Sequence, residues 1–444
     1  MGKGATGVSA LKINIKSPAG LFLLTFFVVR FILYTYYICQ EFFMKNVLDV
    51  LTERGFVKQT VYGDDLRKKL ETESISFYVG FDPTADSLHI GHYIPIMAMA
   101  WMQKFGHTPI ALFGGGTGMI GDPSGRSDMR QMLTPEIIDH NINCFKEQMS
   151  RFIRFDGDNA AIIENNADWL MKLNYVEFLR NIGVHFSVNK MLTAECFRQR
   201  MEKGLTFLEF NYMLMQGYDF LYLHQKHGCV LEVGGDDQWS NMLAGVDLIR
   251  RKEQKDAYCL TCTLLLNSEG KKMGKTQKGA LWLDEKKCSV YDFYQYFRNV
   301  EDVKVAECMR LLTFMDMEEI AELTRYNDER MNQAKERLAF EVTKLVHGEE
   351  KAIEAQKQAK AAFGGNAEDM PTFEANGLTN VIDIIAAAGV AKSKSEARRL
   401  IEGNAISVDD KKITVAEVEL SDEIKAKGSF VLHKGKKVHI NIKL

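Results

Sequence analysis

The sequence lacks several patterns that would place it in a specialised class of protein. Its 56 Lys and Arg residues nearly balance its 59 Asp and Glu residues, so the formal net charge is only -3. A uniformly basic coat protein for nucleic acid is therefore excluded, and any RNA binding has to use local patches of charge. No long-period repeat is visible, which argues against a solenoid or a repeat array.

The cysteines lack the arrangement of a disulfide framework. The eight cysteines are scattered through 444 residues, unlike the dense cysteines of a small secreted domain. Cys259 and Cys262 form a CxxC pair, but no second pair and no histidine follows at the spacing of a zinc site. We therefore predict buried, reduced thiols and no bound metal.

The first 43 residues differ from the rest of the chain. Residues 21–39 are apolar and aromatic and nearly long enough to span a bilayer, and no small-residue cleavage site follows them. A membrane anchor is one interpretation. A mis-assigned start is the other, because an amphipathic helix opens at Met44. We favour the second, and expect a cytoplasmic protein without a membrane partner, because nothing after Met44 looks extracytoplasmic.

Strand and helix patterns alternate through much of the chain. Segments 75–79 and 109–113 are short apolar runs typical of strands, and segment 92–105 is apolar at helical spacing. Further strands are predicted at 229–233 and 259–266. This order predicts an α/β fold with a Rossmann-like, doubly wound parallel sheet, whose ligand crevice lies at the carboxyl ends of the strands.

A chain of this length is expected to contain more than one domain. Residues 122–210 are mostly helical in pattern and read as an insertion between strands. The expected organisation is an atypical apolar leader at 1–43, a Rossmann-like unit with its insertion at 44–288, a helical unit at 289–350, a linker at 351–377 and a small α+β unit at 378–444.

The segment YVGFDPTADSLHIGH follows the first predicted strand and opens a helix at Leu88. Gly80 lets the backbone approach a ligand closely. His89 and His92 are three residues apart and so share a helical face, and N–H groups at a helix start attract anions. The arrangement suits a phosphate, although two surface histidines are the commoner meaning of so short a motif.

A second polar segment, SEGKKMGKT, follows the last predicted strand. Gly270 and Gly274 predict a mobile loop. Lys272 and Lys275 can place compact positive charge on a polyphosphate. By itself, however, such a segment is more often a solvated basic turn.

Together the two segments resemble the signatures of class I aminoacyl-tRNA synthetases. Residues 89–92 read HIGH, and residues 272–276 read KMGKT, similar to the KMSKS loop with the glycine common in the tyrosyl members. The resemblance runs from about Met44 to Leu444 and does not cover the leader. It implies a homodimer that activates L-tyrosine with ATP to tyrosyl-adenylate, releases pyrophosphate and transfers tyrosine to the 3′ end of its tRNA.

The resemblance also implies a tyrosine pocket. Tyr212, Gln216 and Asp219 are spaced by four and three residues and so share one helical face. Glu232 stands where bacterial relatives often carry glutamine, which leaves its contact open. The residues expected to bind tyrosine are Tyr78, Asp122, Tyr212, Gln216, Asp219 and Gln238, with Tyr78 and Asp219 at the substrate phenol.

The activation step needs positioning more than proton transfer. The carboxylate of tyrosine is ionised at neutral pH, so its attack on the α-phosphate requires no general base. Magnesium is expected to arrive with ATP, without a dedicated protein cage. The residues expected to bind ATP are Gly80, Asp82, His89, His92, Gly235, Asp237 and Lys275. The catalytic residues expected at the phosphates are His89, His92, Thr84, Lys272, Lys275, Arg126 and Arg130.

The end of the chain is mildly basic, with 12 Lys or Arg and 9 Asp or Glu in residues 379–444. A capped helix, a short strand, an Asp409–Asp410 turn and a second strand are predicted there. The pattern resembles the S-four-like RNA-binding domain of bacterial tyrosyl enzymes, and the helical unit would be the anticodon-side domain. A solvated helix face is the alternative. The residues expected to contact tRNA are Lys392, Lys394, Arg398 and Arg399.

Two other functions are weighed against this interpretation. A tryptophanyl relative or a small-molecule nucleotidyltransferase would share the fold, but Tyr78 with Asp219 disfavours the first and the RNA-binding tail disfavours the second. A synthetase-like RNA-binding protein without catalysis would show damaged phosphate or substrate residues. Both histidines and both lysines are intact.

Overall fold

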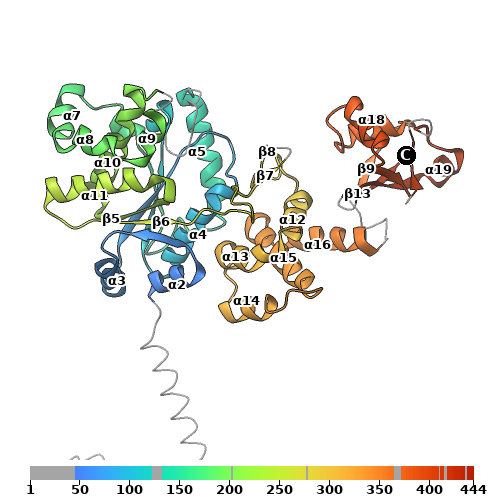
Figure 1. The fold of residues 1–444 in the computed structure, drawn as a ribbon, viewed down its shortest axis with the longest axis horizontal. Coiled ribbons are helices and arrows are strands. Elements are labelled where there is room, and N and C mark those ends of the chain that lie inside the picture. The colour runs from blue at the N-terminus through green and yellow to red at the C-terminus, as the bar shows by residue number, and fades with distance from the viewer. Residues whose placement is uncertain are drawn as a thin grey trace, which may run out of the picture.

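The computed structural model describes residues 46–122, 133–201, 204–276, 279–364, 372–409, 411–414, 418–435 and 438–444. The expected leader lies outside these ranges. Figure 1 shows a large α/β unit, followed by a helical unit and a small C-terminal unit. Among the helices of the described residues, none is both long and apolar enough to cross a membrane.

A six-stranded sheet forms the centre of the α/β unit, with the order β1-β6-β5-β2-β3-β4. Strands β2 to β6 are parallel to their neighbours, as predicted for a doubly wound fold, and β1 pairs antiparallel with β6 at the edge. The strands are β1 (Val57–Thr60), β2 (Ser76–Phe81), β3 (Thr108–Phe113), β4 (Ile162–Asn165), β5 (Cys229–Gly235) and β6 (Tyr258–Cys262).

Two features of this sheet differ from the prediction. Strand β4 lies inside the segment expected to be a helical insertion, and β1 was not predicted. Both strands have only four residues, so neither shows enough alternation to be separated from a loop or helix end. Strand β6 also ends at Cys262, before the predicted end at Leu266. Its two cysteines are buried in the sheet.

Helices cover both faces of the sheet, and β2 alternates between them. Phe77 and Val79 pack in one core with helix α4 (Ile90–Lys104), whereas Tyr78 packs in another with α10 (Phe207–His227) and α11 (Trp239–Glu253). Successive side chains of a strand point to opposite faces. This alternation directs Tyr78 toward α10.

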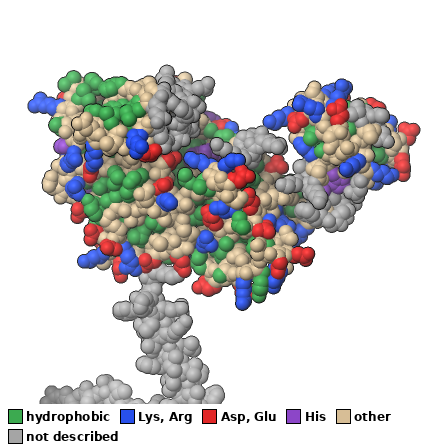
Figure 2. Space-filling view, in the orientation of Figure 1, with side chains coloured by type: hydrophobic (Ala, Val, Ile, Leu, Met, Phe, Trp, Pro, Cys, Tyr) green, Lys and Arg blue, Asp and Glu red, His purple; other side chains and the backbone are tan. Residues whose placement is uncertain are grey.

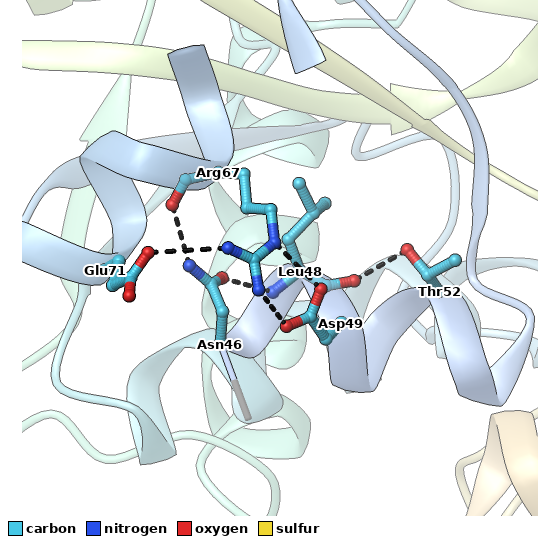
Figure 3. A network of polar contacts seen from close by, with 6 residues as sticks. All are labelled: Asn46, Leu48, Asp49, Thr52, Arg67 and Glu71. Atoms are coloured by element: carbon cyan, nitrogen blue, oxygen red, sulfur yellow. Dashed lines mark hydrogen bonds and ion pairs between the residues drawn. The ribbon is translucent and has the colours of Figure 1, made fainter. Parts of the chain in front are cut away.

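Shorter helices complete the α/β unit. Figure 3 shows how its first helix begins: the Asn46 side chain accepts a hydrogen bond from Leu48 N and donates one to Arg67 O. Arg67 in turn pairs with Asp49 at 2.7 Å. These helices are α2 (Val47–Arg54), α3 (Gly63–Thr72), α5 (Pro135–Met149), α6 (Ala167–Leu170), α7 (Tyr175–Asn181), α8 (Val188–Leu192) and α9 (Glu195–Met201).

The helical unit shares a continuous core with the α4 side of the sheet. Arg54, at the end of α2, donates to the backbone oxygens of Arg310, Thr313 and Met315, and its guanidinium lies 4.3 Å from the ring centroid of Trp101. The first half of the expected linker is helical and belongs to this unit. Its helices are α12 (Val290–Arg298), α13 (Asp302–Leu312), α14 (Met317–Leu323), α15 (Met331–His347) and α16 (Glu349–Gly364).

The C-terminal unit has its own core and a five-stranded sheet with the order β11-β10-β12-β13-β9. The predicted helix, strand, turn and strand are present: Val408 pairs with Lys411 across a turn that begins at Asp409. The elements are β9 (Thr372–Glu374), α17 (Val381–Ala387), α18 (Lys394–Glu402), β10 (Ile406–Val408), β11 (Lys411–Lys412), α19 (Asp422–Lys427), β12 (Ser429–Lys434) and β13 (Val438–Lys443).

Candidate active site

The candidate residues of the α/β unit meet in one cavity of about 300 Å³. It opens at the carboxyl ends of β2 and β5, where a doubly wound sheet binds its ligands. Arg126 and Arg130 lie outside the described residues, as does the side chain of Lys275. The predicted residues that line the cavity are Tyr78, Gly80, Asp82, Thr84, His89, His92, Asp122, Tyr212, Gln216, Asp219, Gly235, Asp237, Gln238 and Lys272.

The two histidines of the first motif cap helix α4. The helix begins at Ile90, two residues after the predicted start, because His89 is its N-cap. Gly91 N donates to Nδ1 of His89 at 3.0 Å, and His89 N donates to Nδ1 of His92 at 3.2 Å. Ile90 N donates to Leu281 O at 3.0 Å. These N–H groups are engaged within the protein, so contacts to a phosphate would come from the side chains.

The capping bonds also set the chemistry of the two rings. A ring nitrogen that accepts a hydrogen bond cannot carry the proton, so a neutral imidazole in this position is protonated on Nε2. The rings of His89 and His92 stack with centroids 3.9 Å apart. Two Nε2–H donors on stacked rings, both at the cavity wall, are suited to phosphate oxygens.

The segment 268–276, here called the lysine loop, packs directly against the start of α4. Gly274 has φ +80°, and a Cβ added there would lie 2.0 Å from Cγ2 of Ile90. Leu281 N donates to Gly274 O at 2.7 Å. Lys272 Nζ reaches to 3.7 Å from Oδ2 of Asp237. The two motifs, far apart in the sequence, are therefore joined on one side of the cavity.

Asp219 lies buried on α10, which packs on the other face of the sheet from α4. Its two carboxyl oxygens accept hydrogen bonds from Asn166 Nδ2 at 2.8 Å and Trp169 Nε1 at 2.7 Å. Burial raises the pKa of Asp219 to about 7. Sequence reasoning missed Asn166 and Trp169 because β4 was read as part of a helical insertion. A polar residue directly after a recognised strand would have been the signal.

Tyr78 and Glu232 are neighbours on parallel strands β2 and β5. Both are 2% exposed. Burial, reinforced by the Glu232 carboxyl, raises the pKa of Tyr78 well above its usual value. Burial also raises the pKa of Glu232 to about 7, and Gln216 Nε2 donates to its Oε1 at 2.9 Å. This answers the open question about Glu232: it holds the amide of Gln216.

A second amide, that of Gln238, also lines the cavity. Gln238 Nε2 donates to Oδ2 of Asp122 at 2.7 Å, and its Oε1 accepts from Asn241 Nδ2 at 3.2 Å. A Cβ at Gly235 would lie 2.6 Å from Oδ1 of Asp237, a side-chain end that can move aside. Gly235, at the end of β5, lines the cavity with its backbone.

The predicted tRNA residues belong to the C-terminal unit and do not line the cavity. Lys392, Lys394, Arg398 and Arg399 are exposed at the start of α18 and along it. Lys394 Nζ pairs with Asp383 at 2.8 Å. Within the described residues, no group of three or more His, Cys, Asp or Glu side chains could hold a metal ion.

Comparisons with known proteins agree with this geometry. A family model described as "tRNA synthetases class I (W and Y)" matches residues 69–364, and one described as "Tyrosine--tRNA ligase SYY-like C-terminal domain" matches residues 363–442. A tyrosine–tRNA ligase of Clostridium botulinum (strain Hall) is 58% identical over 400 residues, which cover 89% of this chain and 98% of the relative. One of Acetivibrio thermocellus is 56% identical, covering 90% and 100%.

The fold has solved counterparts. The crystal structure of a C-terminally truncated mitochondrial tyrosyl-tRNA synthetase of Aspergillus nidulans aligns with a TM-score of 0.65 and 28% identity, covering 72% of this chain and 95% of that one. A tyrosyl-tRNA synthetase of Archaeoglobus fulgidus, at 17% identity and a TM-score of 0.52, shares the fold. The chain belongs to the tyrosine–tRNA ligase family of class I aminoacyl-tRNA synthetases.

Proposed function

We propose that the cavity binds L-tyrosine and ATP side by side and that the chain acts as a tyrosine–tRNA ligase. Activation forms tyrosyl-adenylate and releases pyrophosphate, and the tyrosyl group then passes to the 3′ end of the tRNA. The observation that carries this proposal is the lining of one cavity: it includes the stacked histidines and Lys272 beside the start of α4, and buried Tyr78 and Asp219 on the α10 side of the sheet.

Tyr78 and Asp219 are assigned to the phenol of the substrate. Both are buried, and Asp219 is held in place by Asn166 and Trp169. A substrate hydroxyl can donate to the carboxyl and accept from Tyr78. An amino acid without that hydroxyl would leave buried polar groups unpaired, which costs about 1–3 kcal/mol for each group. The pocket would discriminate against phenylalanine by this penalty.

The α-ammonium is assigned to Tyr212, Gln216, Asp122 and Gln238. Gln216 turns its amide nitrogen toward Glu232. The amide oxygen of Gln216 is then the atom that would accept a hydrogen bond from the α-ammonium of the substrate. Asp122 adds negative charge, held by Gln238.

The phosphates are assigned to the end of the cavity with the two motifs. His89, His92 and Thr84 would donate hydrogen bonds, and Lys272 with Lys275 would add positive charge as pyrophosphate leaves. Gly80, Asp82, Gly235 and Asp237 lie where the nucleoside would pass. Arg126 and Arg130 are assigned to pyrophosphate by the family resemblance. Magnesium is proposed to arrive with ATP and would neutralise charge on the phosphates.

The remaining units are assigned to the RNA. The helical unit and the C-terminal unit would hold the tRNA, the latter through Lys392, Lys394, Arg398 and Arg399, whose charges neutralise phosphates. Domain boundaries near residues 288, 364 and 372 fit the elements better than a linker from 351. The cytoplasm is the assigned compartment, because ATP and tRNA meet there.

A homodimer is the proposed assembly. Figure 2 shows apolar side chains at the upper left, over α7, α8 and the start of α10. A contiguous apolar surface of this kind marks an interface. The exposed residues concerned are Met171, Tyr175, Val176, Val184, Val188 and Phe207.

The decisive experiment is exchange of pyrophosphate into ATP with each of the twenty amino acids, on the full chain and on protein that begins at Met44. Exchange with tyrosine alone is expected. Exchange with another amino acid would overturn the pocket assignment, and no exchange from a folded sample would leave only RNA binding. His89→Ala and Lys275→Ala should slow exchange without changing the affinity for tyrosine, and full exchange in either would remove its assigned role.

A further inference from the structure

Two side chains of the helical unit accept hydrogen bonds from the lysine loop: Glu301 from Ser268 N at 2.9 Å, and Tyr296 from Gly274 N. Tyr296 lies on α12, and its hydroxyl oxygen accepts a hydrogen bond from Gly274 N at 2.8 Å. Gly274 immediately precedes Lys275. A residue outside the cavity lining therefore holds the peptide that leads into a lysine assigned to the phosphates.

This peptide is held on three sides. Its N–H donates to Tyr296, its carbonyl oxygen accepts from Leu281 N at 2.7 Å, and its Cα lies against the Ile90 side chain. The positive φ of Gly274 reserves the site for glycine. Of these contacts, the one with Tyr296 is the link to the helical unit.

Tyr296 is itself well placed to act as a fixed anchor. The residue is half-buried, and its ring meets the Phe297 ring edge-on with centroids 5.3 Å apart. Burial raises the pKa of its hydroxyl, so the group stays neutral across the physiological range. A rigid neutral hydroxyl offers a lone pair in one direction, which suits a backbone N–H.

We propose that Tyr296 is a positioning residue for the activation step: its hydroxyl fixes the Gly274 peptide and so holds the backbone between Lys272 and Lys275 beside the cavity. This inference rests on the proposed function. It makes the placement of the lysine loop depend on the helical unit, so that displacement of α12 would move the loop.

The test compares Tyr296→Phe with the matched control Tyr291→Phe. Tyr291 lies on the same helix and is also half-buried, but its hydroxyl accepts from Gln295 Nε2 at 3.0 Å and does not contact the loop. Loss of one hydrogen bond corresponds to roughly 3- to 10-fold in rate. We expect kcat for tyrosine-dependent exchange to fall by that factor in Tyr296→Phe alone, with unchanged KM for tyrosine and unchanged Tm.

Limited digestion of the full chain with trypsin gives a readout that does not need activity. Cleavage after Lys271, Lys272 and Lys275, identified by fragment mass, should be faster in Tyr296→Phe than in the wild type or the control. Equal cleavage, or equal kcat in an active protein, overturns the inference. A lower Tm with unchanged cleavage also overturns it, since that indicates a structural role. A wild-type protein without exchange would instead contradict the proposed function.

Discussion

Asp219 is a buried carboxyl group that neighbouring side chains hold in one orientation by hydrogen bonds. Both of its oxygens accept hydrogen bonds from residues that follow β4: Asn166, the N-cap of α6, and Trp169, within α6. We expect Asp219→Ala to raise KM for tyrosine roughly 10- to 100-fold, because the phenol loses its acceptor and two buried donors lose theirs. Preference for tyrosine over phenylalanine should fall by a similar factor. The measurement is pyrophosphate exchange with both amino acids.

The control for this experiment is His89→Ala, which should slow exchange and keep the preference for tyrosine. Unchanged discrimination in Asp219→Ala would show that the phenol is recognised elsewhere.

Glu232 predicts a pH-dependent stability for the protein without ligand. Its pKa is raised by burial from 4.5 to about 7, so the folded protein keeps a proton that the unfolded chain releases between these values. The free energy of unfolding contributed by this group is therefore highest below pH 4.5 and falls as pH rises to about 7. Glu232→Gln removes that dependence.

We expect the stability of Glu232→Gln relative to the wild type to increase from pH 5 to pH 8. Urea unfolding at several pH values measures it. The pKa of Asp219 is raised by burial and further by the Glu232 carboxyl, so its response to Glu232→Gln adds to the same trend. The buried histidines His107 and His347, whose pKa values are lowered to about 4, are present in both proteins. A constant difference across this range would contradict the assignment.

At the scale of elements, Arg54 connects α2 to the end of α13 and the turn before α14. Its guanidinium is buried, donates to three backbone oxygens and stacks on Trp101. The single ammonium of lysine cannot reproduce the planar, multiply donating geometry of the guanidinium. We expect Arg54→Lys to lower the free energy of unfolding by about 2–4 kcal/mol, measured by urea denaturation.

Arg67→Lys is the matched comparison for that change. Arg67 is exposed and pairs with Asp49 and Glu71, and exposed ion pairs contribute about 0–1 kcal/mol. Equal losses of stability in the two variants would argue against Arg54 as the connection between the units.

For the whole molecule, the separate core of the C-terminal unit predicts that tyrosine activation survives without it. A chain ending at residue 364 keeps the cavity and its supporting core. We expect tyrosine-dependent exchange within about twofold of the full chain and a loss of at least 10-fold in tRNA charging, since the basic contacts are removed. Normal charging by the shortened chain would remove the proposed RNA role of this unit.

The proposed dimer is tested at the apolar surface. Val184 is 71% exposed, and Val184→Asp would place two charges at a two-fold interface. We expect a shift from dimer to monomer in sedimentation. Val303→Asp, at 70% exposure on α13, should leave the dimer intact. A monomeric wild type, or a dimeric Val184→Asp, would place any interface elsewhere.

The sequence by itself determines those features of the protein that depend on local spacing. The α/β class, the two motifs that meet at the cavity and the polar face of α10 were predictable from local patterns. His92 is three positions after His89, and Tyr212, Gln216 and Asp219 follow one another at intervals of four and three. Local spacing determines which side chains share a face, whatever the rest of the chain does.

Contacts between distant segments were decided by the tertiary structure alone. The partners of Asp219, the pairing of Gln216 with Glu232, the position of Arg54 and the contact between Tyr296 and Gly274 each join elements that no periodicity relates. The strand β4 was too short to predict, and so Asn166 and Trp169 could not be assigned to the pocket. Such partners depend on the path of the whole backbone, which is set by the packing of all elements together.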